Sequence, residues 1–331
     1  MTSSCLECNT RSLDVYVNLR DEPGMTEQDT RAPLAEFDGA VPPAPVWFTT
    51  AMADLPEIGR VVVDGAGVET LTWGGRGKPG LLFLHGNGAH AGWWRFIAPF
   101  FAADYRVTAL SWSGMGGSDH RDAYRVHTFV TEMFAVIEAA GLSDAGPPHV
   151  VAHSFGGFPM MGAAAARGAE LAAAVIVDTP FRGVGEEGGR PPNATLRPHR
   201  IYPTLAEALA RFRFAPAQGC PNPFIADDIA RRSLIEVPGG WTWAFDPYLW
   251  ARFEVGDARE LLKSPGCPVA LIWGKDSLLM PPDRVAAMRA ALPPGTPAIE
   301  IPGAEHHVMV DQPLAFVAAL RALFASWPQP R

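Results

Sequence analysis

The stretch "HVVAHSFGGF" (149–158) places Ser154 between an apolar run and two glycines. Where a strand turns sharply into a helix, the residue between them has a strained backbone and exposes its side chain at the edge of the sheet. The residues two positions before and after must then be small. Gly156 satisfies this, and Ala152 adds only one methyl group. The pattern favours Ser154 as a nucleophile over a serine that only caps the following helix.

A serine nucleophile needs a base, and histidine is the usual one. His306 in "IPGAEHHVMVDQP" follows the last strand-like run, where a loop could bring it back over the sheet to Ser154. Its neighbour His307 is the rival. We prefer His306 because it stands directly after the strand-to-loop turn. The alternative for both residues is a pair of surface histidines.

The base in turn needs a carboxylate that fixes its tautomer and stabilises the imidazolium. Asp276 in "LIWGKDSLLMPP" lies two residues past the glycine that ends an apolar run, and Asp178 ends "AVIVD". We prefer Asp276 for its chain position within the order Ser, Asp, His. Asp178 remains the second candidate, and Glu305 is too near His306 in sequence to reach round its ring.

A developing oxyanion needs donors, and backbone N–H groups are suited to this. The turn "FLHGNGAH" (83–90) follows a strand-like run, so we expect the N–H of Asn87 to be one donor. The N–H of Phe155, directly after Ser154, is the other. His85 and His153 we expect to pack or to support the site. His149 and His153 share a strand face without a third ligand in view, so we expect no metal.

Apolar runs bounded by Gly or Pro alternate with helical stretches and would position these groups. The runs cover 80–86, 106–112, 149–154, 173–180, 268–274 and 297–303, after two short strands within 60–73. Helical candidates lie near 92–103, 127–141, 157–168, 282–291 and 312–326. This alternation predicts an α/β fold with a doubly wound, mostly parallel sheet. The carboxyl ends of its strands would carry the site.

Two segments depart from this rhythm. Residues 1–45 are polar, and we expect a weakly ordered extension there, with Met25 and Met52 as alternative starts. Residues 181–262 lack the βα alternation but are rich in Pro, Gly and aromatic residues. A loop of that length is unusual in a compact domain, so we expect an inserted, mainly helical cap. The core would then comprise 46–180 and 263–331.

The composition of the chain excludes several classes of function. A net charge of −8 with no basic run argues against a nucleic-acid partner. No apolar run approaches the roughly 18 residues of a membrane span, and no signal-peptide pattern is present, so we expect a cytoplasmic protein without a membrane partner. Cys5, Cys8, Cys220 and Cys267 do not form a disulfide framework. A homo-oligomer is compatible with this composition.

Five motifs in this order resemble those of α/β-hydrolase-fold enzymes over residues 58–328. They are "LHGNG", "LSWSGMGGSD", "AHSFGG", "WGKDS" and "PGAEHHVMVDQP". The resemblance implies serine hydrolysis without a metal or organic cofactor, and a cap between strands six and seven. Haloalkane dehalogenases and epoxide hydrolases resemble this fold but need a carboxylate nucleophile, which argues against both activities here.

We therefore expect a hydrolase of a carboxylic ester or lactone, acting through an acyl-enzyme on Ser154. Aromatic residues of the cap region would surround a small apolar or aromatic substrate. The expected substrate-binding residues are Trp112, Trp241, Trp243 and Phe181. One alternative is a carbon–carbon bond hydrolase of a vinylogous diketone that uses the same triad. Another is a hydrolase-fold binding protein without catalysis.

Overall fold

The structure is a computed structural model that describes residues 32–181, 197–254 and 265–327. Its centre is an eight-stranded sheet in the order β1-β2-β4-β3-β6-β7-β11-β12. The strands are β1 (Glu57–Val63), β2 (Ala66–Trp73), β3 (Gly80–Leu84), β4 (Arg106–Leu110), β6 (His149–His153), β7 (Ala173–Val177), β11 (Val269–Gly274) and β12 (Ala298–Ile301). The pairs β1–β2 and β2–β4 are antiparallel, and the neighbours from β4 to β12 are parallel. The expected mostly parallel, doubly wound sheet is confirmed.

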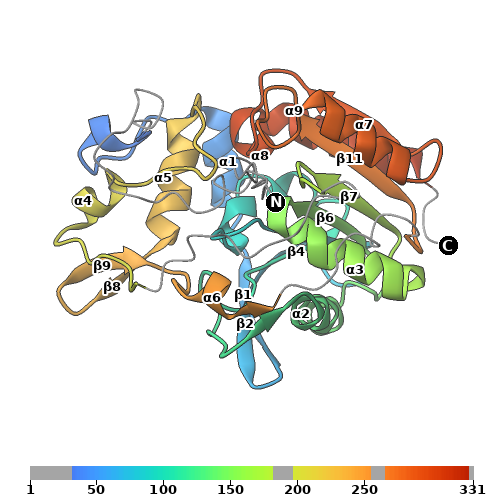
Figure 1. Cartoon of the computed structure of the whole chain (residues 1–331), viewed down its shortest axis with the longest axis horizontal. Coiled ribbons are helices and arrows are strands. Elements are labelled where there is room, and N and C mark those ends of the chain that lie inside the picture. Colours follow the sequence, from blue (N-terminus) through green and yellow to red (C-terminus); the bar gives the residue numbers. More distant parts are fainter. Residues whose placement is uncertain (1–31, 182–196, 255–264, 328–331) are drawn as a thin grey trace, which may run out of the picture.

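Each face of the sheet is buried under its own layer (Figure 1). On one face, Val151 of β6 shares a core with Phe316 and Leu320 of α9 (Pro313–Ser326). On the other face, Val150 and Ala152 share a core with α2 (Val126–Ala139), α3 (Gly157–Arg167) and α7 (Pro282–Ala291). Successive residues of β6 thus point to opposite cores, as the period of two in a strand requires. Burying both faces explains why these strands are continuously apolar.

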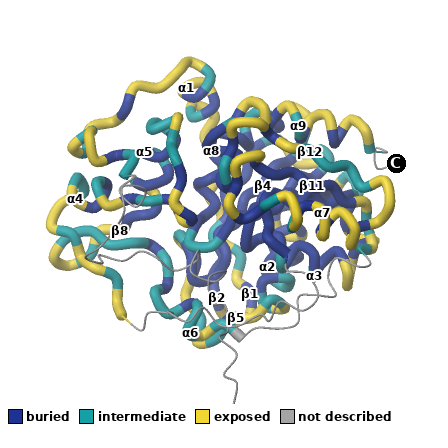
Figure 2. The backbone as a smooth tube through the Cα atoms, turned by 45° about the horizontal axis from the view of Figure 1, so that its top comes forward, coloured by how far each residue is buried: buried dark blue, intermediate teal, exposed yellow. Residues whose placement is uncertain are grey.

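The described residues 197–254, between β7 and β11, lie largely to one side of the sheet (Figure 1). Their elements are α4 (Leu205–Leu209), α5 (Pro223–Arg232), β8 (Leu234–Val237), β9 (Gly240–Trp243), α6 (Leu249–Arg252) and β10 (Phe253–Glu254). In both views α4, α5 and β8 lie far from α7, and Figure 2 shows that α4 is much more exposed than the central strands. We call residues 197–254 the cap region. Of the expected cap, 181–262, residues 182–196 and 255–262 lie outside the described residues.

Two sequence expectations are refined by these elements. The helix expected near 92–103 is instead two 3₁₀ turns, η4 (Ala91–Trp94) and η5 (Ala98–Phe100). Pro99 has no N–H for an α-helical hydrogen bond, which accounts for the break. Of the expected extension, residues 1–31 lie outside the described residues. The described remainder includes η3 (Ala35–Phe37); Leu34 beside it is buried, and the Gly39 carbonyl accepts from Arg231 of α5 at 2.7 Å.

The turn from β6 into α3 brings two backbone segments close together. It forms the 3₁₀ turn η6 (Ser154–Gly156). A Cβ on Gly156 would lie 2.7 Å from the carbonyl oxygen of His85 and 3.2 Å from Cβ of Leu84. A backbone atom cannot move aside as a flexible side chain can. Glycine at this position therefore sets the distance between the turn after β3 and Ser154.

We expect Gly156→Ala to lower the free energy of unfolding by about 1–3 kcal/mol, because the new methyl group pushes these segments apart. Gly162→Ala in α3 is the matched control. A Cβ there would lie 3.4 Å from Val130 Cγ2, and alanine gains about 0.5–1 kcal/mol over glycine in a helix interior. Urea denaturation of both variants checks this, and equal effects would contradict the steric account.

Candidate active site

Ser154 lies at the carboxyl end of β6 in a left-handed backbone conformation. Its φ is 52°, which a residue other than glycine adopts only under constraint. Thr179 Oγ1 donates to the Ser154 carbonyl at 2.9 Å and helps to hold the turn. Ala152 is fully buried between Leu84 and Ile176 of the neighbouring strands. The methyl group that departs from the usual glycine is thus accommodated.

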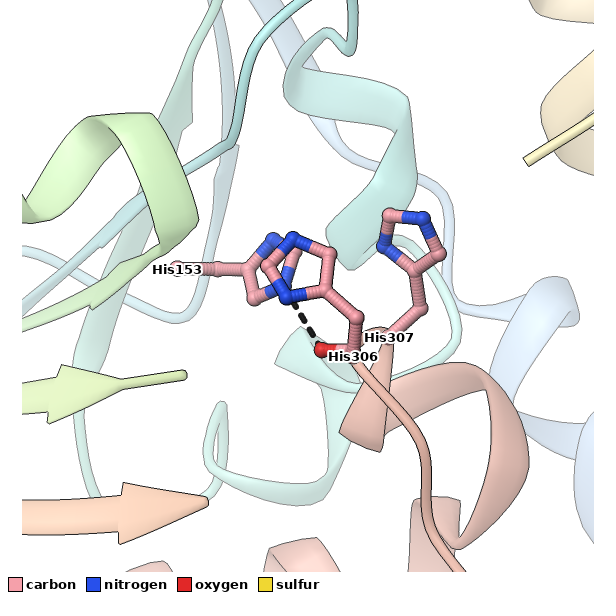
Figure 3. Close-up of side chains that lie close together, drawn as sticks. All are labelled: His153, His306 and His307. Carbon is pink, nitrogen blue, oxygen red and sulfur yellow. Dashed lines mark hydrogen bonds between the residues drawn. The ribbon is translucent and has the colours of Figure 1, made fainter. Parts of the chain in front are cut away.

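His306 lies in the loop between β12 and α8 (Val308–Asp311). Its Nε2 is 3.0 Å from Ser154 Oγ, and its ring is 2% exposed. The rings of His153 and His306 overlap in Figure 3, with centroids 4.7 Å apart, and His153 Nε2–H donates to the His306 carbonyl at 3.0 Å. Among the described residues, neither ring nitrogen of His307 forms a hydrogen bond to Ser154. Of the two candidate bases, the structure brings His306 to the serine.

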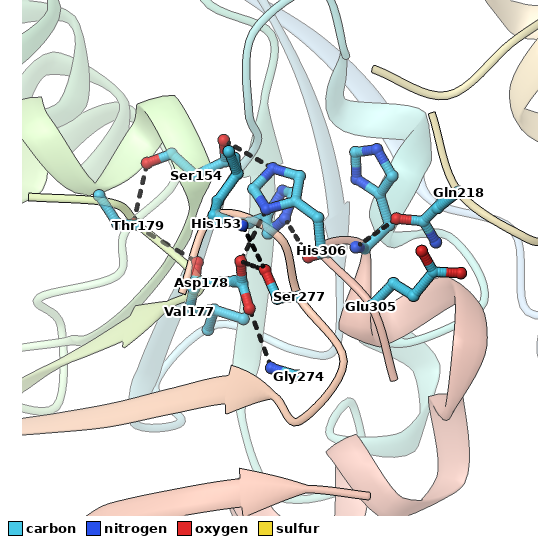
Figure 4. A network of polar contacts seen from close by, with 12 residues as sticks. His153, Ser154, Val177, Asp178, Thr179, Gln218, Gly274, Ser277, Glu305 and His306 are labelled. Atoms are coloured by element: carbon cyan, nitrogen blue, oxygen red, sulfur yellow. Dashed lines mark hydrogen bonds and ion pairs between the residues drawn. The ribbon is translucent and has the colours of Figure 1, made fainter. Parts of the chain in front are cut away.

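Asp178 holds the other side of the His306 ring (Figure 4). It directly follows β7, is fully buried, and accepts from His306 Nδ1–H at 2.7 Å. The same oxygen, Oδ1, accepts from the Ser277 hydroxyl at 2.7 Å, and Oδ2 accepts from the N–H of Gly274 at 2.9 Å. Three donors thus compensate this buried carboxylate. With Nδ1 donating, Nε2 is free to accept the Ser154 proton.

The preference for Asp276 as the carboxylate partner is corrected by this geometry. Asp276 is exposed, and its backbone N–H is bonded to the carbonyl of Ala304 at 2.9 Å. The turn after β11 directs the next residue inward instead, because Ser277 is the one that reaches Asp178. The second candidate of the sequence, Asp178, is the residue in contact with His306.

The turn after β3 lies beside Ser154, as expected. Asn87 and Ser154 line the same small cavity, and among the described residues no acceptor bonds the Asn87 N–H. Phe155 N–H lies in the first turn of η6, where N–H groups lack intrahelical acceptors. His85 accepts from Trp112 N–H and donates to the Gly86 carbonyl, and burial lowers its pKa to about 3. The neutral ring of His85 thus braces this turn.

The cavity over Ser154 is narrow, with a volume of about 10 Å³, roughly the space of one water. It is lined by Gly86, Asn87, Ala89, Trp93, His153, Ser154, Ala215, His306 and His307. None of the four aromatic residues expected to bind substrate is in this lining, as far as the described part of the chain shows. Trp112 is buried with its indole N–H bonded to the His85 carbonyl, and Phe181 packs on Phe158. Trp241 and Trp243 lie in β9 of the cap region.

The histidines around this cavity are the described residues that come nearest to a metal-binding set. His153, His306 and His307 each have a ring nitrogen within 4.8 Å of the others. Both nitrogens of His306 are already engaged by Asp178 and Ser154, and His153 Nε2 is engaged by a carbonyl. An ion bound by all three would displace Ser154 or Asp178 from His306. The geometry therefore suits proton transfer rather than metal ligation.

A polar network that the sequence did not reveal joins the cap region to the histidine loop. Gln218 donates to both oxygens of Asp311 at 2.9 and 3.0 Å, and its Oε1 accepts from His307 N–H at 2.9 Å. Gly219 N–H donates to Glu305 Oε1 at 2.9 Å. Burial raises the pKa of Asp311 to about 7, with the Glu305 charge adding to the effect and hydrogen bonds opposing it. We call this network the latch.

Comparison with known proteins identifies the family of the chain. A sequence profile described as the alpha/beta hydrolase family matches residues 81–320, most of the chain. The chain belongs to the α/β-hydrolase family. Within this family, the chain is 24% identical over 299 residues to a serine hydrolase-like protein of Danio rerio. That match covers 81% of this chain and 88% of that protein.

Two further similar proteins match very different shares of the chain. The chain is 31% identical over 101 residues to epoxide hydrolase 4 of Homo sapiens, which is 30% of this chain and 27% of that protein. Among solved structures, an esterase from Mycobacterium tuberculosis matches with a TM-score of 0.60 at 20% identity, covering 92% of this chain and all of that one. At this identity the structural match shows the shared fold. Among the described residues, no helix has the length and apolar character to cross a bilayer.

The two carboxylates make a matched pair for mutation. We expect Asp178→Asn to lower kcat/KM for an ester substrate about 10³- to 10⁴-fold, because the amide favours the wrong imidazole tautomer. Asp276→Asn should change it less than about 2-fold, as expected of an exposed surface substitution. Steady-state kinetics with melting temperatures as the folding control check this. A large loss in Asp276→Asn alone would restore Asp276 as the acid.

The latch predicts a pH dependence of stability. Folded Asp311 keeps its proton up to about pH 7, whereas its ordinary pKa is 3.8, so between these values the folded state holds more protons. Its contribution to stability therefore falls as pH rises through this window, by an amount on the order of 3–4 kcal/mol. We expect Asp311→Ala to flatten the fall, as measured by urea denaturation from pH 4 to 8. An unchanged slope would contradict the raised pKa.

Proposed function

We propose that this α/β hydrolase cleaves a carboxylic ester through an acyl-enzyme on Ser154. The observation that carries the proposal is the unbroken hydrogen-bonded chain from Ser154 Oγ through His306 to Asp178, with distances of 3.0 and 2.7 Å. All three side chains are buried and come from different segments of the fold. A nucleophile, a base and an orienting carboxylate in this arrangement are suited to acyl transfer.

In the first half-reaction, His306 Nε2 takes the proton of Ser154 as Oγ attacks the ester carbonyl. The Asp178 carboxylate stabilises the imidazolium that forms. The N–H groups of Asn87 and Phe155 would hold the oxyanion, and one such donor typically contributes about 3–4 kcal/mol. His306 then returns the proton to the leaving alkoxide. In the second half-reaction, the same ring activates water, which releases the acid and frees Ser154.

A serine at position 154 also favours ester cleavage over epoxide opening, the two reactions that the names of similar proteins suggest. Attack of a serine oxygen on an epoxide would give an ether, which the same machinery could not hydrolyse. The partial similarity to a protein named epoxide hydrolase 4 therefore gives weak support for epoxide opening. The protein named as an esterase, which shares the fold over nearly the whole chain, supports acyl transfer. A lactone presents the same carbonyl chemistry and belongs to the same proposal.

Labelling with a fluorophosphonate and a panel of p-nitrophenyl acyl esters test the proposal. We expect label on Ser154 alone, and we expect Ser154→Ala to lose about 10⁴-fold or more in kcat. A panel that includes a ring-cleavage dienone distinguishes ester cleavage from carbon–carbon bond hydrolysis. If intact protein takes up no label and cleaves no ester, the proposal fails and a binding protein of this fold is the better account.

A further inference from the structure

Several buried polar atoms of the described residues have no hydrogen-bond partner. They are Trp93 Nε1, Trp94 Nε1, His149 Nδ1, Asp228 Oδ2 and both ring nitrogens of His307. Such atoms are rare in folded proteins because their lost hydration is not replaced. Two of these residues, Trp93 and His307, line the cavity over Ser154. Two residues with unsatisfied nitrogens thus lie in the wall of the cavity that holds the nucleophile.

The ring of His307 is fixed in this position. Its centroid lies 5.1 Å from Trp93, 5.0 Å from Phe214 and 4.8 Å from His306. Its backbone N–H is held by Gln218 of the latch at 2.9 Å. Figure 3 shows the ring standing apart from those of His153 and His306, with no dashed line to either. The packing therefore keeps a polar ring in the cavity wall rather than in water.

The protonation state of His307 defines what the ring offers. Burial, with the neighbouring His306 and His153 rings, holds the pKa of His307 well below its ordinary value, although the Ala215 carbonyl opposes this. At neutral pH the ring has one N–H donor and one acceptor nitrogen. The Trp93 indole adds a donor and cannot accept. These two residues of the wall thus carry two neutral donors and one acceptor beside a narrow cavity.

We propose that Trp93 and His307 bind an oxygen atom in the acyl group of the substrate, beyond the carbonyl that Ser154 attacks. This inference rests on the proposed function. Trp93 belongs to the segment after β3 that also carries Asn87, which places it on the carbonyl side, whereas the leaving group must meet His306 Nε2. The narrow cavity restricts the acyl chain to a short one. The class is an ester of a short alkoxy, hydroxy or oxo acid.

An isosteric pair of substrates tests this proposal. In p-nitrophenyl methoxyacetate an ether oxygen replaces one methylene group of p-nitrophenyl butanoate. The quantity to compare is the ratio of kcat/KM for the two esters, because dividing the wild-type ratio by that of a variant cancels their intrinsic reactivities. We expect His307→Leu and Trp93→Phe each to lower this ratio about 5- to 30-fold, as expected for loss of one hydrogen bond.

The other unsatisfied atoms supply matched controls. His149→Leu and Trp94→Phe make the same two substitutions outside the cavity lining, where His149 packs on Phe324 and Trp94 on Phe83. Both should keep the wild-type ratio. The ring of His307 has no hydrogen bond of ordinary geometry and only the Ala215 carbonyl near it, so the melting temperature of His307→Leu should equal or exceed that of the wild type. Wild type should also be inhibited about 5-fold more strongly by methoxyacetate than by butanoate.

Three results would overturn the inference. The first is an unchanged ratio in both cavity variants while Ser154 still takes up label and both esters are cleaved, which leaves the proposed function intact. The second is an equal fall of the ratio in His149→Leu or Trp94→Phe. The third is a clear loss of thermal stability in His307→Leu, which would mean that its ring has a structural partner. Absence of label and of any ester cleavage removes the proposed function itself.

Discussion

The buried carboxylate of Asp178 is the constraint on which the site depends. A charge without solvent is tolerated only where donors replace its hydration. Here the three donors come from two segments: His306 Nδ1–H from the loop after β12, and the Ser277 hydroxyl and the Gly274 N–H from the end of β11 and the turn after it. The ends of β7 and β11 and the loop after β12 must therefore meet at one point. The left-handed backbones of Ser154 and Asp178, with φ of 52° and 45°, are part of the same arrangement.

Much of the fold could be predicted from the sequence because its signal is local. Continuous apolar runs become buried parallel strands, and the glycines after β6 mark a tight approach, so the strands and Ser154 were within reach. The carboxylate partner of His306 could not be predicted in this way, because Asp178 and Asp276 both follow strands. The choice depends on which residue the turn after β11 directs inward, and Ser277 has that place. Periodicity does not encode the direction of a side chain in such a turn.

The residues that line the cavity over Ser154 could not be predicted for a similar reason. Trp241 and Trp243 were chosen because aromatic residues in an insertion favour a binding role, but in the structure they lie in β9, and Trp112 braces the turn after β3. His307 was weighed only as a rival base, and Trp93 lies in the stretch 92–103 that was expected to be a helix. Only the three-dimensional arrangement shows that their nitrogens lack partners. Whether a polar atom has a hydrogen-bond partner depends on its three-dimensional surroundings, so no sequence pattern reveals it.

The latch connects the cap region, which lines the cavity over Ser154, to the loop that carries His306. Gln218 and Gly219 of the cap region bind the loop that carries His306, and Ala215 of the same stretch closes the cavity. Any displacement of this stretch that widens the cavity also removes hydrogen bonds from the base-bearing loop. The width of the cavity and the hydrogen bonds that support the loop of His306 therefore depend on the same few residues of the cap region.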